Sequence, residues 1–267
     1  MPRCRLLAAL AVALAVLPVV PASAQAATAL QPHRAIYALS LLEASSANGV
    51  SDIAGELYFE WSATCGGWRV NQHVAMVVAG DSEPGREMSL RYASTEARDG
   101  SSFDFTLLQQ MNGQVIERIA GTATKGAAGG LARFEYPSGG RLLLPPGTLF
   151  PAEYALQSIA HVVAGEAMFS APFFDGSTAE TVYSAVTFAG TPERVVSIAS
   201  AEPRLAWPAQ TAYFELNDDG AEPAFEVGAQ MFENGVANVF TMDHGSFAVL
   251  ATLDRYEALG MPDCPPD

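Results

Sequence analysis

The stretch WRVNQHVAMVV, residues 68–78, decides the fold class. Large apolar side chains fall on alternate positions of this stretch: Trp68, Val70, Val74, Met76 and Val78. The positions between them carry Arg69, Asn71, His73 and Ala75. Successive side chains of a strand point to opposite faces of the sheet, so this period of two predicts a half-buried β-strand.

The same alternation recurs through most of residues 33–258, in runs at 34–43, 53–61, 86–97, 101–111, 114–124, 131–136, 179–189, 193–200, 210–216, 224–232, 236–242 and 247–258. Pairs such as Asn112-Gly113 and Asn234-Gly235 separate these runs and supply the positive φ angles of tight hairpin turns. About 13 strands joined mainly by hairpins predict a mainly β protein with a single large antiparallel sheet. Because a flat sheet of that size would expose long edges, we expect it to coil into a β-spiral or open barrel.

One segment departs from this alternation. Residues 151–165 carry apolar side chains at helical spacing, namely Leu156, Ile159, Ala160, Val162 and Val163. Pro151 suits the first turn of a helix and Gly165 suits its C-terminal cap. We therefore expect one amphipathic helix of three or four turns that packs on the sheet, with residues 142–150 as its extended lead-in.

The N-terminus has the features of a secretory signal. Arg3 and Arg5 precede an apolar run from Leu6 to Val20, and Ala22-Ser23-Ala24 fits the site of signal peptidase. The alternative is a transmembrane anchor, but the apolar run is shorter than the roughly 20 residues that span a bilayer. The sequence thus predicts a signal peptide at 1–24 cleaved before Gln25, no transmembrane anchor, and one exported domain at 25–267.

The charge balance excludes one class of partner. The chain has 14 basic and 29 acidic residues, a net charge of −15, and loss of Arg3 and Arg5 makes the exported domain more acidic still. A protein with so few cations cannot neutralise the phosphates of a nucleic acid, so we expect no nucleic-acid partner.

The cysteine count becomes even after cleavage. Cys4 is lost with the signal, which leaves Cys65 and Cys264. Two cysteines in an oxidising compartment predict one disulfide. The alternatives are a pair of free thiols or a metal site, and two isolated cysteines without CxxC spacing make a poor zinc site.

No catalytic or cofactor motif emerges from the sequence. The four histidines are far apart, no GxSxG elbow is present, and no metal-ligand or nucleotide-binding spacing occurs, so we expect no metal and no cofactor. The turn Asn217-Asp218-Asp219-Gly220 lacks the alternating ligands and closing Glu of a calcium loop. With so many acidic residues, a carboxylate pair at glycosidase spacing can arise by chance, so a hydrolase stays open as an alternative.

Aromatic residues gather in the C-terminal half of the sequence. They are Phe173, Phe174, Trp207, Tyr213, Phe214, Phe225 and Phe232. The plain interpretation is sheet core. The sharper one is an apolar groove for a lipid or acyl chain, formed by the first five of these residues, since a curled sheet with a helix resting on it is a suitable container.

Several motifs in order along the chain resemble the EipB family, the periplasmic cell-envelope-integrity proteins of alphaproteobacteria. These motifs are His33 to Tyr37, the strand at 55–60 with Cys65, Leu144 to Pro151, Phe173 to Gly176, Trp207-Pro208, Ala212 to Phe214, Glu233 to Val236, Met242-Asp243 with Gly245 and Phe247, and Cys264. The sequence departs from the family pattern in the turn after Asp243, where His244-Gly245-Ser246 replaces Tyr-Gly-Asp.

The resemblance implies a many-stranded antiparallel β-spiral with a helix, a disulfide between the early and final cysteines, and a periplasmic location. It also implies a non-enzymatic role in envelope integrity and a link to a periplasmic tetratricopeptide-repeat protein. The leading hypothesis is therefore a protein that works by binding, either as a scaffold for a protein partner or as a carrier of a lipid or lipoprotein-type ligand. The alternative is a periplasmic hydrolase that acts on envelope glycans through a carboxylate pair.

Overall fold

The computed structural model describes residues 30–45, 49–80, 85–218, 220 and 222–265. The signal peptide predicted at 1–24 lies outside these residues. The described chain forms one helix, α1 (Pro151–Val163), and fifteen strands. The strands are β1 (His33–Ala44), β2 (Val50–Thr64), β3 (Gly67–Gly80), β4 (Arg86–Ala97), β5 (Ser102–Met111), β6 (Gln114–Gly126), β7 (Gly129–Tyr136), β8 (Arg141–Leu144), β9 (Met168–Phe173), β10 (Tyr183–Ala189), β11 (Glu193–Ser197), β12 (Ser200–Glu215), β13 (Phe225–Phe232), β14 (Ala237–Asp243) and β15 (Phe247–Ala258).

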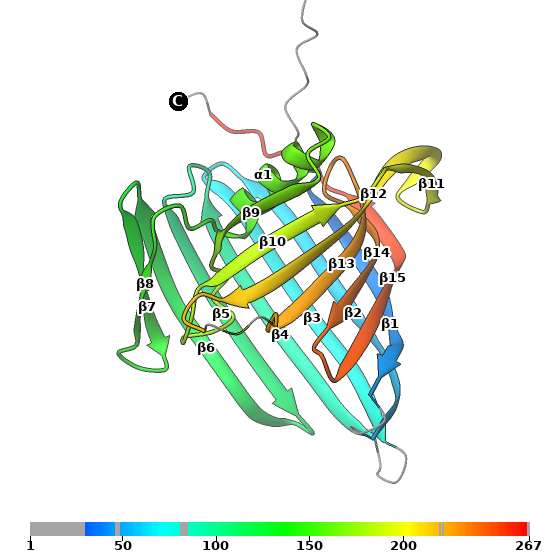
Figure 1. Cartoon of the computed structure of the whole chain (residues 1–267), viewed down its shortest axis with the longest axis horizontal. Helices are drawn as coiled ribbons and strands as arrows, with labels where there is room; N and C mark the ends of the chain where they lie inside the picture. Colours follow the sequence, from blue (N-terminus) through cyan, green and yellow to red (C-terminus); the bar gives the residue numbers. More distant parts are fainter. Residues whose placement is uncertain (1–29, 46–48, 81–84, 219, 221, 266–267) are drawn as a thin grey trace, which may run out of the picture.

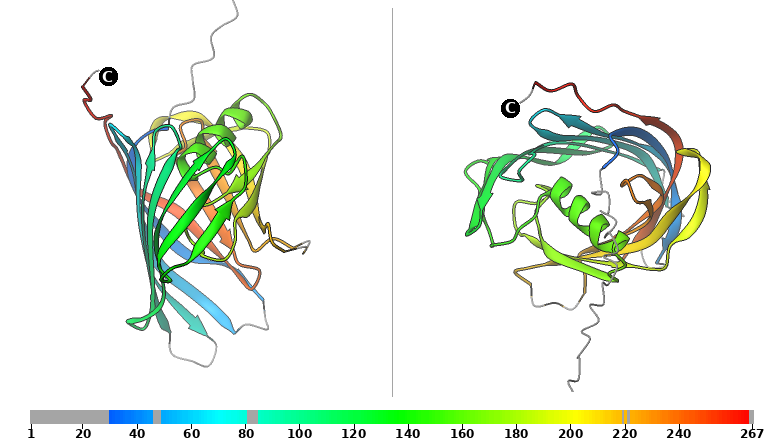
Figure 2. Two further views of the ribbon diagram at one scale, coloured as in Figure 1. Left: turned by 90° about the vertical axis from the view of Figure 1, so that its left-hand side faces the viewer. Right: turned by 90° about the horizontal axis from the view of Figure 1, so that it is seen from above.

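All strands belong to one antiparallel sheet with the order β8-β7-β6-β5-β4-β3-β2-β1-β15-β14-β13-β12-β10-β9, and β11 pairs with β12 beside this path. The pairing of β1 with β15 joins the first strand to the last, so the two halves of the chain form one continuous wall. The sheet ends at β8 and β9, which are not paired with each other. It coils without closing (Figures 1 and 2). The predicted fold class is confirmed.

Alternation of side chains builds the interior. On β3, Val70 and Met76 are buried, whereas Arg69, His73 and Ala75 are exposed. The predicted inward face of residues 68–78 therefore points to the inside of the coil.

Helix α1 lies inside the coiled sheet, and the view from above in Figure 2 shows strands around most of it. Its buried face carries Ala152, Tyr154, Ser158, Ile159 and Val162. A Schellman-type end satisfies the last carbonyls, because the N–H of Gly165 donates to Val162 and that of Glu166 donates to His161, both at 3.0 Å. Gly165 adopts a φ of +86°, which an L-residue rarely takes.

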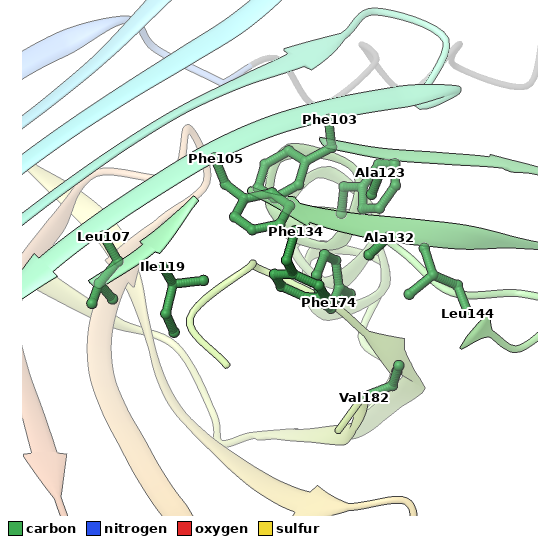
Figure 3. Packing of buried hydrophobic residues seen from close by; sticks show 11 residues of the cluster. Phe103, Phe105, Leu107, Ile119, Ala123, Ala132, Phe134, Leu144, Phe174 and Val182 are labelled. Carbon is green, nitrogen blue, oxygen red and sulfur yellow. The ribbon is translucent and has the colours of Figure 1, made fainter. Parts of the chain in front are cut away.

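A cluster of phenylalanines fills one side of the interior (Figure 3). Phe105 on β5 contacts Phe174 edge-on with ring centroids 5.4 Å apart, and Phe103 stacks on Phe150 at 5.0 Å. All four rings are at most 2% exposed. This cluster fixes the segments on either side of α1 against β5.

The structure corrects several predicted elements. Strands β8 and β9 were not predicted, β10 begins at Tyr183 rather than 179, and β12 begins at Ser200 rather than 210. Prolines explain two of these errors, because Pro172 lies in β9 and Pro208 lies within β12, and proline normally indicates the edge or end of a strand. Within α1, Ala160 is exposed, so it does not belong to the predicted apolar face.

The structure contains the disulfide that the cysteine count predicts. The Cα atoms of Cys65 and Cys264 lie 5.5 Å apart across 199 residues of sequence. Cys65 lies in the turn between β2 and β3, so the bridge attaches the C-terminal segment to that turn. Of the helices in the described part of the chain, none is long and apolar enough to cross a membrane.

Candidate ligand cavity beneath the helix

A cavity of about 270 Å³ lies between the inner face of the sheet and the start of α1. One wall comes from four neighbouring strands: Phe59 and Trp61 of β2, Val70 and Gln72 of β3, Leu90 and Tyr92 of β4, and Leu107 of β5. The opposite wall comes from Pro151, Phe173, Asp175 and Ser177. Apolar and aromatic side chains thus supply most of the lining, and no Lys or Arg contributes to it.

Two polar groups of the sheet wall have no partner. The indole Nε1–H of Trp61 is buried without an acceptor, and it is the one such side-chain nitrogen or oxygen among the described residues. The ring of Trp68 meets that of Trp61 edge-on, with centroids 6.0 Å apart. The side chain of Gln72 makes no hydrogen bond to a described residue. A buried donor without an acceptor costs about 1–3 kcal/mol, so native proteins rarely retain one.

The carboxyl group of Asp175 is held by its own loop. Its Oδ1 accepts a hydrogen bond from the backbone N–H of Ser177 at 2.9 Å, and the hydroxyl of Tyr92 donates to the Asp175 carbonyl at 2.8 Å. Burial raises the pKa of Asp175 above its ordinary value, against the opposing effect of the Ser177 hydrogen bonds. Burial also raises the pKa of Tyr92, so its phenol stays protonated and can donate. These contacts position the segment after β9 as a wall of the cavity.

A second buried carboxyl group fixes the start of α1. Phe150 offers the helix no side-chain cap, and Pro151 has no N–H. Glu96 of β4 accepts the next two backbone N–H groups instead, from Ala152 at 2.7 Å and from Glu153 at 2.9 Å. Burial raises the pKa of Glu96 to about 7, although both of these hydrogen bonds lower it.

Two further contacts hold α1 in place. Lys125 of β6 forms an ion pair with Glu153 in the first turn. On the far side, the hydroxyl of Tyr154 hydrogen-bonds Thr187 of β10 at 2.8 Å, and Thr187 hydrogen-bonds Thr211 of β12 at 2.7 Å. The helix is therefore attached to both sides of the coiled sheet. These contacts fix the position of Pro151 in the wall of the cavity.

The comparisons with known proteins agree with this architecture. A family model described as EipB-like matches residues 24–260. The chain belongs to the EipB-like family. It is 27% identical over 248 residues to the cell envelope integrity protein EipB of Brucella abortus (strain 2308), with 88% of each chain covered. Its fold is similar to the crystal structure of a β-barrel-like protein of a domain of unknown function from Brucella abortus. The TM-score is 0.82 at 23% identity, and the match covers 88% of this chain and all of that one.

Of the aromatic residues predicted to form one groove in this EipB-like chain, Phe173 and Tyr213 pack together, with ring centroids 5.5 Å apart, and the other three lie elsewhere. Phe173 lines the cavity, whereas the next residue, Phe174, lies in the phenylalanine cluster. Tyr213 stacks on Phe225 with centroids 4.4 Å apart, and burial raises the pKa of its phenol. Trp207 is buried farther along β12 and does not line the cavity.

Phe214 also lies away from the cavity. It follows Tyr213 on β12, and adjacent strand residues point to opposite faces, so Tyr213 faces inward and Phe214 outward. Phe232 packs in a separate small core with Ala206 and Val236. Of the five predicted residues, Phe173 lines the cavity and Tyr213 packs against Phe173, and a ligand role for all five stays a prediction.

The cavity residues that the sequence patterns did not single out come from the N-terminal half. Phe59, Trp61 and Tyr92 share the inward parity of their strands, and this alternation was the available signal. The sequence did not reveal that a space remains between α1 and the inner face of these strands. No group of three or more His, Cys, Asp or Glu side chains in the described part of the chain is arranged to hold a metal ion.

Proposed function

We propose that this EipB-like protein supports envelope integrity in the periplasm by binding a lipid or lipoprotein-type ligand in the cavity beneath α1, without catalysis. The observation that carries the proposal is a mainly apolar cavity that is lined in part by Trp61, whose buried indole N–H has no acceptor within the described residues. An ester or amide carbonyl on an otherwise apolar chain would supply that acceptor after a small rotation of Trp61. The envelope role rests on the relation to the EipB protein of Brucella abortus.

The size and charge of the cavity restrict the ligand. A volume of about 270 Å³ equals that of about nine water molecules at roughly 30 Å³ each. This space suits one short acyl segment and not a whole diacyl lipid. Because no cation lines the cavity and Asp175 does, a buried anionic headgroup would be left without compensation. The charged part of the ligand should therefore stay outside.

The carboxylates support a binding function better than hydrolysis. Asp175 holds the N–H of Ser177, Asp243 accepts from the N–H of Gly245 at 2.7 Å, and Glu233 is paired with Arg204 at 2.8 Å. Each of these carboxylates thus has a local structural partner. The hydrolase on envelope glycans remains the alternative function that the experiment must separate.

The test is native mass spectrometry with lipid extraction on protein purified from the periplasm. Val70 lines the cavity, so Val70→Phe should fill it and remove the co-purified ligand. Val77 lies on the outward face of the same strand and is 43% exposed, so Val77→Phe is the matched control that should retain the ligand. Both variants must keep the unfolding midpoint of the wild type to within a few degrees; if Val70→Phe does not, Leu90→Phe takes its place.

Three outcomes bear on the proposal. The proposal is supported if an apolar molecule co-purifies with the wild type and with Val77→Phe but not with Val70→Phe. Folded wild-type protein with no bound molecule, and with no uptake of added acyl chains, excludes the carrier function and favours a scaffold for a protein partner such as the tetratricopeptide-repeat protein. The variants Asp175→Asn, Glu233→Gln and Asp243→Asn should each restore detergent resistance to a deletion strain. Complete loss with one folded carboxylate variant would favour the hydrolase.

A further inference from the structure

A second hollow lies on the opposite, outward face of the sheet. Two adjoining pockets of about 530 and 500 Å³ share Asn71, Ala93 and Thr106 and so form one groove. The groove crosses the strands from Tyr58 on β2 to Glu135 on β7. That path covers five strand spacings, about 24 Å at the usual separation of neighbouring strands. The sheet itself separates this groove from the cavity beneath α1.

Small residues make the floor of the groove and longer polar ones make its sides. Ala93, Ala120 and Gly121 have little or no side chain, which leaves the sheet surface low along this line. The outward polar side chains of the lining are Tyr58, Arg69, Asn71, His73, Arg91, Thr95, Asp104, Thr106, Thr122 and Glu135. Most of the residues that line the groove therefore have polar side chains.

The guanidinium groups of the groove make no direct contact with a carboxylate of the described residues, although the charge of Arg69 adds to the hydrogen bond from Arg34 in lowering the pKa of Glu60. Arg69 and Arg91 are exposed, and neither makes a hydrogen bond or a salt bridge to a described residue. Glu60, on the outward face of β2, is already paired with Arg34 at 2.7 Å. Of the two carboxylates of the groove, Glu135 lies at its β7 end and Asp104 lies on β5 beside β4, whereas both arginines lie on β3 and β4.

This face of the sheet is less acidic than the C-terminal part of the chain. Residues 164–267 contain 16 acidic and 3 basic side chains. By contrast, the outward faces of β1 to β7 carry five arginines, Arg34, Arg69, Arg91, Arg118 and Arg133, beside the carboxylates of Glu56, Glu60, Glu87, Asp104 and Glu135. In a protein of such acidity, a groove with free guanidinium groups is complementary to an anionic partner.

The lining also indicates the kind of partner. Protein interfaces depend on aromatic or aliphatic anchors in central pockets, and the groove offers Tyr58 and a half-buried Leu108 but no deep apolar pocket. It offers instead a row of hydrogen-bonding side chains, with arginines that suit bidentate contacts to carboxylate or phosphate. We propose that this outward groove binds an anionic polysaccharide, with its acidic groups over Arg69 and Arg91 and its hydroxyl groups along the threonines.

Binding of a fluorescently labelled oligogalacturonate, a carboxylated glycan, tests the proposal by polarisation with the whole exported chain. A neutral maltooligosaccharide of equal length and a poly-glutamate peptide are the comparison probes. The carboxylated glycan should bind, the neutral one should bind at least tenfold more weakly, and the affinity should fall as salt rises from about 50 to 300 mM, because exposed charges are screened.

Variants locate the site. Arg91→Ala removes one charged hydrogen-bond donor and should weaken binding about tenfold. Ala93→Trp fills the floor without a change in charge and should weaken it at least as much. Arg194→Ala removes the same charge from the exposed β11 strand, far along the sheet order, and should leave the affinity unchanged.

The outcomes are decisive once each variant keeps its unfolding midpoint. Equal binding of the neutral glycan, no binding of either glycan, or an equal effect of Arg194→Ala overturns the proposal. Preference for poly-glutamate over the glycan overturns it in favour of an acidic protein segment. Because the groove and the cavity lie on opposite faces, none of these results depends on the ligand beneath α1.

Discussion

The buried carboxyl group of Glu96 should make the stability of this protein depend on pH in an unusual direction. Most carboxyl groups in folded proteins are stabilised as anions, and their contribution is lost in acid. Glu96 is 4% exposed, and burial raises its pKa from 4.5 to about 7. Lys125 and the N–H groups of Ala152 and Glu153 favour the anion, whereas the charge of Glu153 opposes it.

The sign follows from proton binding. The folded protein holds the proton of Glu96 more tightly than the unfolded chain does, so the stabilising contribution is complete below about pH 4.5. It declines as the pH rises toward 7 and stays constant above that. A shift from 4.5 to about 7 corresponds to about 3 kcal/mol of unfolding free energy.

The assay compares urea unfolding of the wild type and Glu96→Gln at several pH values between 4.5 and 8. The glutamine places an amide N–H near one of the helix N–H groups, which adds a cost that does not depend on pH. The free energy of unfolding of the wild type relative to the variant should therefore fall by about 3 kcal/mol across this range. All other titrating groups are the same in the two proteins and cancel.

Glu56→Gln is the control, because it removes an exposed carboxylate from the outward face of β2. A wild-type-to-Glu96→Gln difference that stays flat within about 1 kcal/mol from pH 4.5 to 8 would refute the reasoning. The pKa of Glu96 would then be the same in the folded and the unfolded protein. The helix N-terminus would compensate the effect of burial completely.

Two further predictions concern the attachment of the tail and of the helix. The chain-entropy model gives about 5 kcal/mol for a loop of 199 residues, so Cys264→Ser should lower the free energy of unfolding by a few kcal/mol. Cys65→Ser should cost about the same and the double variant no more, as measured by urea unfolding; additive losses would contradict a shared bridge. Ile159 is 2% exposed, so Ile159→Asp should destabilise by more than about 3 kcal/mol, whereas Ala160→Asp on the exposed face should cost less than about 1. Equal melting temperatures for these two helix variants would contradict the observed orientation of α1.

The sequence predicted the fold well where local pattern and tertiary structure agree. Residues 68–78 alternate cleanly because one side of β3 faces the interior and the other faces solvent. The pattern failed at β8, whose four residues include three consecutive leucines and show no period of two. It also failed at β9, where a proline and a position directly after α1 disguised a strand.

The candidate site was harder to predict than the fold. The prediction grouped Phe173, Phe174, Tyr213 and Phe214 because aromatic residues gather in the C-terminal half of the sequence. Adjacent residues of a strand point to opposite faces, so the periodicity that predicted the sheet separates Tyr213 from Phe214 on β12. The cavity itself depends on where α1 sits inside the coil, and that position is set by long-range contacts such as Glu96 to Ala152, 56 residues apart.

The same strands supply both candidate sites, one residue apart. On β4, Tyr92 lines the cavity and its hydroxyl holds the Asp175 loop, whereas Arg91 beside it faces the outward groove. On β3, Val70 faces inward and Arg69 outward. A register slip of one residue would exchange the two faces and place guanidinium groups in the core. The sheet must therefore hold its register to keep both sites. Substitutions at Arg91 and at Val70 should affect one site each, because each side chain lies on one face of the same wall.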